Sequence, residues 1–268
     1  MLSIAGSDSG GGAGIQADLK AFAACGVHGM TAITAITAQN TVGVDLIEPV
    51  SPAMIVAQIE AVAGDIGVDA VKIGMLGDRA TIEAVSRGLD LLEGVPVVLD
   101  PVMVSESGAD LLEADARDAL VSQILPRVSV VTPNIPEARV ITGLNEVAGT
   151  ESGQMAPDQS ELARAIVGLG AAAALVTGGH SEQVIDLFYD GEREVGITGE
   201  VHPGRSAHGS GCTHSSALAS YIALGFDPLE AAREARSLAS RAVAESLEGI
   251  GAGPGPVNAL GLRPVPRG

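Results

Sequence analysis

The sequence alternates short apolar runs with longer amphipathic stretches along most of its length. A strand followed by a helix, repeated many times, is typical of a mainly parallel sheet covered by helices on both faces, because parallel neighbours need a crossover connection. The chain is therefore predicted to be an α/β protein. The expected strands span residues 2–5, 29–37, 70–73, 95–99, 128–131, 173–176 and 184–189. The expected helices span residues 14–25, 52–65, 79–92, 112–124, 135–142 and 158–169, with two final helices near 211–224 and 228–247.

The organisation of the chain favours one domain over residues 1–268. No internal repeat and no long low-complexity linker divides it. Residues 145–158 are polar and contain glycine, which predicts a surface loop. Residues 253–268 are rich in glycine and proline, which predicts an irregular tail.

The charge balance narrows the classes of partner. The chain has 33 acidic and 15 basic residues, a net charge of -18, and its only lysines are Lys20 and Lys72. Such a surface lacks the cations that neutralise phosphate, so nucleic acid and anionic membranes are not expected partners. An acidic, lysine-poor surface is found in proteins of salt-loving microbes, where salt screens the repulsion. An ordinary acidic protein is the alternative.

Other bulk features predict a cytoplasmic protein. No run of eighteen apolar residues is present, so a membrane span is not expected. The N-terminus, MLSIAGSDSGGG, lacks the basic and apolar regions of a signal peptide. The two cysteines, Cys25 and Cys212, are expected to stay reduced. A small molecule is the expected partner, and a homodimer is the expected assembly, although no motif specifies it.

Polar residues follow several of the predicted strands. In an open parallel sheet, ligands bind beyond the carboxyl ends of the strands, so these residues should converge on one site. They belong to the segments Gly6 to Asp8, Gln39 to Asn40, Lys72 to Met75, Asp100 to Pro101, Thr132 to Asn134, and Thr177 to Gly179.

The glycine-rich segment AGSDSGGGAGIQADLKAF, residues 5–22, follows the first strand. It is neither the dinucleotide fingerprint, because Ile15 stands where the third glycine belongs, nor a Walker A loop, because no Lys-Ser/Thr pair follows. A structural connector is therefore one interpretation. Asp8, Gln16 and Asp18 favour a functional one, although Asp18 could be a first-turn charge favoured by the helix dipole.

Two further motifs carry amides and a carboxylate. Gln39 can donate and accept hydrogen bonds together, which suits the edge of a nitrogen heterocycle, but a Gln-Asn pair at 39–40 also forms turns. The segment TPNIPEA, residues 132–138, contains Asn134 and Glu137 three residues apart. This pair could hold a hydrated Mg2+ with its phosphates, or it could simply cap a helix.

The segment SAHGSGCTH, residues 206–214, joins a glycine turn to a predicted helix. Gly209, Ser210 and Gly211 can present backbone N–H groups, and the helix adds its positive end, which predicts an anion hole for a phosphoryl group. The same field should favour a thiolate on Cys212. Taken alone, Cys212 is better explained by packing than by catalysis. His208 and His214 lack the spacing of a zinc site.

Together these motifs resemble the hydroxymethylpyrimidine/phosphomethylpyrimidine kinases of thiamine biosynthesis, within the ribokinase-like superfamily. The resemblance runs from about residue 2 to residue 258. It rests on the order of the segments AGSDSGGGAGIQADLK, GMTAITAITAQNT, VKIGML, LDPVMV, TPNIPEA, GGH, HGSGCT and GIGAGPGPVN.

The resemblance implies a three-layer α/β/α ribokinase-like fold with a mainly parallel sheet, and transfer of the ATP γ-phosphoryl group, with Mg2+, to a hydroxymethylpyrimidine and then to its monophosphate. It implies these site residues. The catalytic residues would be Cys212 as base with Gly209, Ser210 and Gly211. The substrate would be bound by Gln39, Asp18, Met75, Gly6 and Val102. Nucleotide and phosphate would be bound by Asn134, Glu137, Thr177, Gly179, His180 and Lys72. The metal would be held by Glu137 and Asp100, through water.

The sequence departs from the family pattern at two places. Thr177 stands where many relatives have lysine before Gly-Gly-His, so a phosphate contact would have to come from elsewhere. Arg205 is either a new phosphate neighbour or an exposed charge. A pyridoxal or pyridoxine kinase is the nearest alternative function, because its substrate is also a flat nitrogen ring with a hydroxymethyl group. A non-catalytic pyrimidine sensor is the alternative from another class. A nicotinamide-dependent oxidoreductase is disfavoured by the missing dinucleotide fingerprint.

Overall fold

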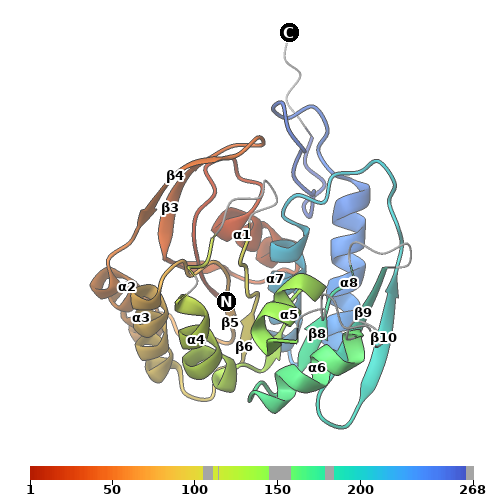
Figure 1. Ribbon diagram of the computed structural model, residues 1–268. Helices are drawn as coiled ribbons and strands as arrows, with labels where there is room; N and C mark the ends of the chain where they lie inside the picture. Colours follow the sequence, from red (N-terminus) through yellow and green to blue (C-terminus); the bar gives the residue numbers. More distant parts are fainter. Residues whose placement is uncertain (105–110, 114, 145–157, 179–183, 264–268) are drawn as a thin grey trace, which may run out of the picture.

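The structure is a computed structural model that describes residues 1–104, 111–113, 115–144, 158–178 and 184–263. Its centre is an eight-stranded sheet with the order β10-β9-β8-β7-β6-β5-β1-β2 (Figure 1). The strands from β8 to β2 are parallel, and β9 and β10 join that edge in antiparallel pairs. The bounds are β1 Leu2–Ala5, β2 Met30–Ile33, β5 Val71–Ile73, β6 Val97–Leu99, β7 Val130–Val131, β8 Ala174–Val176, β9 Val184–Tyr189 and β10 Glu194–Gly199.

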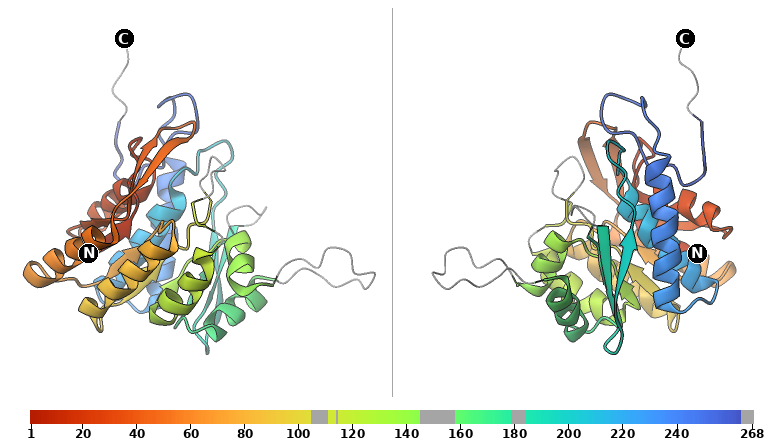
Figure 2. Two further views of the ribbon diagram at one scale, coloured as in Figure 1. Left: turned by 60° about the vertical axis from the view of Figure 1, so that its left-hand side comes forward. Right: turned by 90° about the vertical axis from the view of Figure 1, so that its right-hand side faces the viewer.

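Helices cover both faces of this sheet, so the predicted three-layer fold is confirmed (Figure 2). One face carries α1 Gly14–Ala24, α7 Ser210–Ala223 and α8 Pro228–Ala244. The other carries α2 Pro52–Asp65, α3 Arg79–Leu89, α4 Ala116–Ala119, α5 Ile135–Thr142 and α6 Gln159–Gly168. The helix expected over 112–124 begins only at Ala116 and continues as a π-helical stretch, Leu120–Ile124, and a 3-10 turn, Leu125–Arg127. The other predicted helices agree with the structure to within a few residues.

The single strand predicted over residues 29–37 is wrong. The chain leaves the main sheet at Thr34 and continues as β3, Ala35–Gln39, which pairs with β4, Val44–Pro49, in a separate two-stranded sheet. The hydroxyl of Thr34 donates to the carbonyl of Met75, and its own carbonyl accepts from Val50. The apolar run is continuous across this break, so its pattern hides the change of sheet.

The structure also contains two strands that the sequence analysis missed. β4 is exposed over most of its length, and β10 is a half-exposed edge strand. Neither strand has the buried, continuously apolar pattern that identifies the central strands of a parallel sheet.

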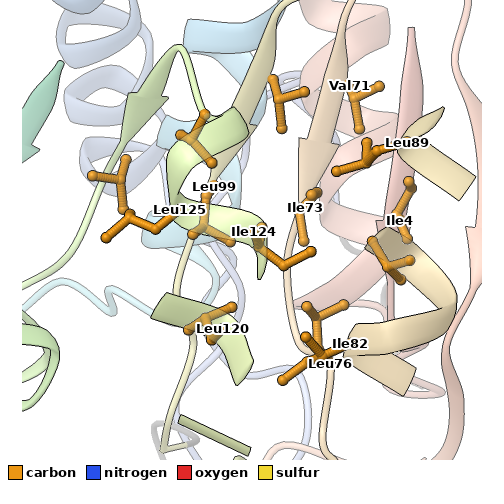
Figure 3. Close-up of a cluster of buried hydrophobic side chains, with 14 of the residues drawn as sticks. Ile4, Val71, Ile73, Leu76, Ile82, Leu89, Leu99, Leu120, Ile124 and Leu125 are labelled. Atoms are coloured by element: carbon orange, nitrogen blue, oxygen red, sulfur yellow. The ribbon is translucent and has the colours of Figure 1, made fainter. Parts of the chain in front are cut away.

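The core lies in two layers because neighbouring residues of a strand face opposite sides of the sheet. Val98 faces α7 and α8, whereas Val97 and Leu99 face the helices α2 to α6. Figure 3 shows part of the second layer, where Ile73 and Leu99 pack with Ile82 of α3 and Leu120. Because the side chains of β6 are buried on both faces of the sheet, the carboxyl end of this strand is held in a fixed place.

The C-terminal residues described, 249–263, form no helix and no strand, which agrees with the predicted irregular tail. They are nevertheless packed, because the N–H of Val257 donates to His208 O and the N–H of Asn258 donates to Ala242 O. Residues 145–157 of the predicted surface loop lie outside the described residues. Within the described ranges, no helix combines the length and apolar character needed to cross a membrane.

Candidate active site

A buried charged network lies beneath the carboxyl ends of β1, β5 and β6. The Lys72 ammonium of β5 donates to Asp18 Oδ1 at 2.8 Å and lies 3.9 Å from Asp100 Oδ2. Asp18 also accepts hydrogen bonds from the hydroxyls of Ser3 and Ser216. Burial opposes a charge on Lys72, but Asp18, Cys212 and Asp100 raise its pKa above the ordinary value. The network therefore holds one permanent cation against two carboxylates.

Asp18 and Lys72 have no exposed side-chain surface. The sequence analysis assigned Asp18 to the substrate and Lys72 to the nucleotide phosphates. The structure places both one layer deeper, where each is satisfied by protein groups. Both side chains therefore stabilise the floor of the site, and neither is exposed to a ligand.

The Asp100 carboxylate lies close enough to Glu137 to affect the ionisation of Glu137. Burial raises the pKa of Asp100, against the opposing effects of Lys72 and Ser215, whose hydroxyl donates to Asp100 Oδ2 at 3.0 Å. Burial and the nearby Asp100 carboxylate raise the pKa of Glu137 to about 8. A carboxyl group whose charge is disfavoured by burial and by a neighbouring carboxylate marks a site where a cation would be stabilised.

The donor chemistry of this carboxylate pair fits Mg2+. Mg2+ prefers hard oxygen ligands and keeps several waters, so it usually takes only one or two protein carboxylates together with substrate phosphates. Asp100 and Glu137 would supply those carboxylates. No cluster of three or more histidine, cysteine or acidic side chains that could hold a metal occurs among the described residues, so these two groups would need phosphate and water to complete a shell.

Asn134 and Glu137 form a helix cap, which was one of the two alternatives for this pair. The Asn134 side chain accepts from the Glu137 N–H at 2.8 Å, and the Glu137 carboxylate accepts from the Asn134 N–H at 2.9 Å. This capping box positions the Glu137 side chain at the start of α5. The capping interpretation is thus correct, and it is compatible with a metal role, because a carboxylate has further lone pairs to offer.

The start of α7 is the segment for which the sequence predicts an anion hole. Gly209 adopts φ of 79°, and a Cβ there would collide with the carbonyl oxygen of Gly12, so only glycine fits. The N–H of Ser210 donates to Ala207 O, so it is used within the turn. The backbone N–H groups of Gly211 and Cys212 have no acceptor among the described residues. These two groups, with the helix dipole, can bind an anion.

Cys212 is a thiol rather than the expected thiolate. Burial raises its pKa to about 12, and Asp100 and Asp18 add to the rise, whereas Lys72 and the N–H of Gly14 lower it. The positive end of a helix was predicted to favour the charged form. Burial is the main cause of the raised pKa, and the two carboxylates that add to it are distant in sequence, so the local motif gave no sign of them.

Asp8 organises the glycine-rich loop between β1 and α1. Its carboxylate accepts hydrogen bonds from the N–H groups of Gly10, Gly12 and Ala13 at 2.7 to 2.9 Å. His208 Nε2 lies 3.7 Å from Asp8 Oδ2, and His208 together with these N–H groups lowers the pKa of Asp8 despite its burial. The loop after β1 is thereby joined to the turn before α7. These contacts give Asp8 a structural role, and the functional interpretation of this loop stays a prediction.

Two of the predicted substrate residues, Gly6 and Met75, lie in contact at one wall of the site. The Met75 methyl group lies against Gly6, where a Cβ would clash with it. The Gln39 Oε1 atom accepts from the Thr37 hydroxyl at 3.3 Å. Asn40 is a turn residue, since its side chain accepts from the N–H groups of Val42 and Gly43. Val102 follows Asp100 and is partly exposed.

A cavity of about 290 Å³ adjoins this wall at Met75. It lies between the base of the β3–β4 pair and the start of α3, and Thr34, Ile47, Leu76 and Thr81 are among its lining residues. Of the predicted substrate residues, Met75 alone lines it. Gly6, Gln39 and Val102 do not.

The predicted nucleotide segment begins at the end of β8. The N–H of Thr177 donates to Pro133 O, which places Thr177 beside Asn134. Gly179 and His180 lie outside the described residues. Arg205 pairs with Glu248 at 2.6 Å on the surface, with 43% of its side chain exposed, so the interpretation as an exposed charge is favoured.

Three serines of the network were missed by the sequence analysis. Ser215 and Ser216 follow Cys212 by about one turn of α7, and Ser3 lies on β1. They donate to Asp100 and Asp18, which are remote in sequence. The one available signal was the unusual density of serine on a helix that follows the glycine turn.

Comparison with known proteins agrees with the geometry. The chain matches the family model described as phosphomethylpyrimidine kinase over residues 8–258. It is 48% identical over 261 residues to the hydroxymethylpyrimidine/phosphomethylpyrimidine kinase of Rhizobium meliloti, with 96% of this chain and 95% of that protein covered.

Two solved structures share the fold. The pyridoxal kinase of Staphylococcus aureus in complex with ADP has a TM-score of 0.85 at 33% identity, covering 96% of this chain and 92% of that one. The phosphomethylpyrimidine kinase of Clostridium difficile has a TM-score of 0.74 at 40% identity, covering 88% of this chain and 95% of that one. With its ribokinase-like fold, its acidic pair beside a helix N-terminus and these similarities, the chain belongs to the phosphomethylpyrimidine kinase family.

Proposed function

We propose that this kinase transfers the γ-phosphoryl group of ATP to the hydroxymethyl group of 4-amino-5-hydroxymethyl-2-methylpyrimidine, and then a second phosphoryl group to the monophosphate. The observation that carries the proposal is the start of α7. There the free N–H groups of Gly211 and Cys212 lie beside Asp100, at the carboxyl ends of the parallel strands. Phosphoryl transfer depends mainly on positioning and charge neutralisation, and this arrangement offers both.

Each part of the site has a role in that reaction. The N–H groups of Gly211 and Cys212 would bind the transferred phosphoryl group. Gln39 would hydrogen-bond the aminopyrimidine edge, and Met75 and Gly6 would pack against the ring, with Val102 beside it. Asn134 and Thr177 follow neighbouring strands, Glu137 lies in the first turn of α5, and all three would face the nucleotide phosphates. Gly179 and His180 are proposed to bind the same phosphates.

We further propose that Asp100 and Glu137 hold Mg2+, partly through water. The ion would neutralise charge on the phosphates. The protein contributes a fixed carboxylate pair: the capping box orients Glu137, and Ser215 orients Asp100. Lys72 supplies a positive charge beneath the pair.

Cys212 is placed to act on the substrate hydroxyl. A thiol with a pKa of about 12 is protonated at neutral pH, so in the ligand-free protein it can only orient the hydroxyl by hydrogen bonding. Asp100 is one of the groups that raise this pKa, so neutralising Asp100 with a cation would bring Cys212 closer to serving as a base. No covalent intermediate on Cys212 is needed.

Product analysis with ATP, Mg2+ and the hydroxymethylpyrimidine tests the proposal. The expected products are the pyrimidine monophosphate, then the diphosphate, with stoichiometric ADP. The assay should include molar salt, because a net charge of -18 destabilises a compact protein at low ionic strength. Pyrimidine binding without any phosphorylated product would instead support the sensor alternative.

A pyridoxal kinase is the second candidate, and the structural similarity to the Staphylococcus aureus pyridoxal kinase favours it. The higher identity to the Rhizobium meliloti enzyme favours the pyrimidine. Comparing kcat/KM for the two alcohols under the same conditions separates them. A large preference for pyridoxal would reject the first choice.

We also propose that the chain works as one domain, in the cytoplasm and as a homodimer, with neither nucleic acid nor membrane as a partner. Both cysteines are unpaired, as expected in a reducing compartment. The β3–β4 pair exposes Ile36, Leu46 and Ile47, an apolar surface that a second copy could cover. Analytical ultracentrifugation in high salt measures the assembly, and a Leu46→Glu variant should shift it toward monomer.

A further inference from the structure

A second buried charged cluster lies outside the network described above. It joins Asp186 of β9, His214 of α7 and Arg236 of α8. The Asp186 side chain is 1% exposed and that of His214 is 6% exposed. Arg236 reaches in from α8, and its guanidinium group lies against Gly199 of β10, where a Cβ would collide with it. Figure 2 shows β9 and β10 beside α8.

The two oxygens of Asp186 have different partners. Oδ1 accepts a hydrogen bond from the N–H of Gly178 at 3.1 Å. Oδ2 lies 3.7 Å from Arg236 Nη1 and 3.9 Å from His214 Nε2, and these distances are too long for direct hydrogen bonds. Burial lowers the pKa of His214, so Arg236 is the cation of the cluster at neutral pH. The charge of Arg236 therefore keeps the Asp186 carboxylate in place below Gly178.

Gly178 is fixed from several sides. A Cβ at this position would collide with the carbonyl oxygen of Ile185. The Gln159 amide of α6 donates to both Val176 O and Ile185 O, which joins β8 to β9 at this point. Asp186 supplies a further anchor, from the face of the sheet that carries α7 and α8.

The same cluster reaches the start of α7. His214 lies two residues after Cys212, on the helix whose first N–H groups form the anion-binding end. Gly178 directly follows Thr177, at the end of β8 that the proposed function assigns to nucleotide phosphates. Asp186 therefore lies between the backbone assigned to the nucleotide and the helix assigned to the transferred phosphoryl group.

We infer that Asp186, held by the charge of Arg236, is a positioning residue for the nucleotide: it fixes the backbone at Gly178 relative to α7. This inference rests on the proposed function, because it concerns the phosphate side of that same site. Asp186 is buried and acts through the backbone, so it does not touch the pyrimidine. Its loss should weaken ATP binding far more than binding of the alcohol.

Steady-state kinetics of Asp186→Ala test the inference. The KM for ATP should rise about tenfold or more, since a hydrogen bond to a charged acceptor is lost and the Arg236 charge is left buried without its partner. The KM for the hydroxymethylpyrimidine should stay within about twofold of the wild-type value. In Asp186→Asn, an amide oxygen can still accept from Gly178, so most of the affinity for ATP should return.

Asp190→Ala is the matched control. Asp190 lies just after β9, at the turn where it binds Arg193, far from Gly178 along the strand. Its removal should leave both KM values unchanged. Equal increases of both KM values in Asp186→Ala, or a wild-type KM for ATP in the folded variant, would overturn the inference.

A measurement on the wild-type protein covers the case in which Asp186→Ala fails to fold. ADP should slow hydrogen exchange in the peptides that contain Gly178 and Asp186, and it should not change exchange in β4. Unchanged exchange at Gly178 with ADP bound would overturn the inference. If the wild-type protein consumes no ATP with any alcohol tested, the proposed function itself fails, which is a different outcome from a kinase with an insensitive Asp186.

Discussion

Replacing Lys72 with methionine should destabilise the protein strongly. Lys72 and Asp18 are both fully buried, 2.8 Å apart, and Asp100 lies 3.9 Å from the same ammonium group. Methionine fills a similar volume but leaves two buried carboxyl groups without their cation. Breaking a buried pair by removing one partner costs about 3–5 kcal/mol. For a chain of this size, that corresponds to a fall in Tm of about 10 °C.

Urea denaturation and thermal melting at neutral pH measure the effect. Lys20→Met is the matched control, because Lys20 is the other lysine of the chain and donates a single hydrogen bond to Gly11 O from a partly exposed position. Its loss should cost about 1 kcal/mol or less. A Tm of Lys72→Met within about 2 °C of the wild-type value would show that the buried charge is not needed.

A double-mutant cycle separates charge from packing. Asp18→Asn in the Lys72→Met background removes one of the carboxylates that the lysine neutralised. The double variant should therefore be more stable than the sum of the two single effects predicts, by about 1 kcal/mol or more. Simple additivity would mean that the losses come from packing alone.

Three further predictions concern the site. Cys212→Ala should lower turnover about 100-fold with little change in ATP affinity, and unchanged turnover would remove Cys212 from the mechanism. Glu137→Gln should match the wild-type stability below about pH 4.5. Because the folded pKa of about 8 lies above the ordinary glutamate value of 4.5, the ligand-free wild type should lose stability as pH rises through this window. Above pH 8 the variant should therefore be more stable than the wild type by up to about 4 kcal/mol. Urea denaturation at a series of pH values measures this, and a free-energy difference between the two proteins that does not change with pH would contradict it. Gly209→Ala should lower both Tm and activity, because φ of 79° and the Gly12 carbonyl leave no room for a methyl group, whereas Gly64→Ala, with open space around it, should not.

The local motifs predicted most of the elements around the site, because each is specified within a few residues. The capping box of Asn134 and Glu137 is a spacing of three residues, and it forms as one of the two alternatives that the sequence left open. The glycine turn at Gly209 is specified by its own backbone conformation. The apolar runs of the central strands are specified by burial on both faces.

The apolar pattern gave a wrong prediction where one continuous strand and two consecutive strands have the same sequence signature. An apolar run continues from β2 into β3, but the chain changes sheets at Thr34. The exposed strand β4 lacks the signature because nothing covers its side chains in the described structure. The apolar periodicity of a sequence indicates which residues are buried, so it does not identify a strand, such as β4, whose side chains are mostly exposed.

By itself, the sequence determined the α/β class, the order of the motifs and the location of the site at the strand ends, since those properties follow from local patterns and from the rule that parallel strands end together. Only the tertiary structure decided the electrostatics. Asp18, Lys72, Asp100 and Cys212 come from four distant segments, and their charges act through space. The thiol of Cys212, the enclosed Lys72 and the cation-attracting pair of Asp100 and Glu137 are therefore properties of the fold, because ionisation depends on distance and burial rather than on neighbours in the chain.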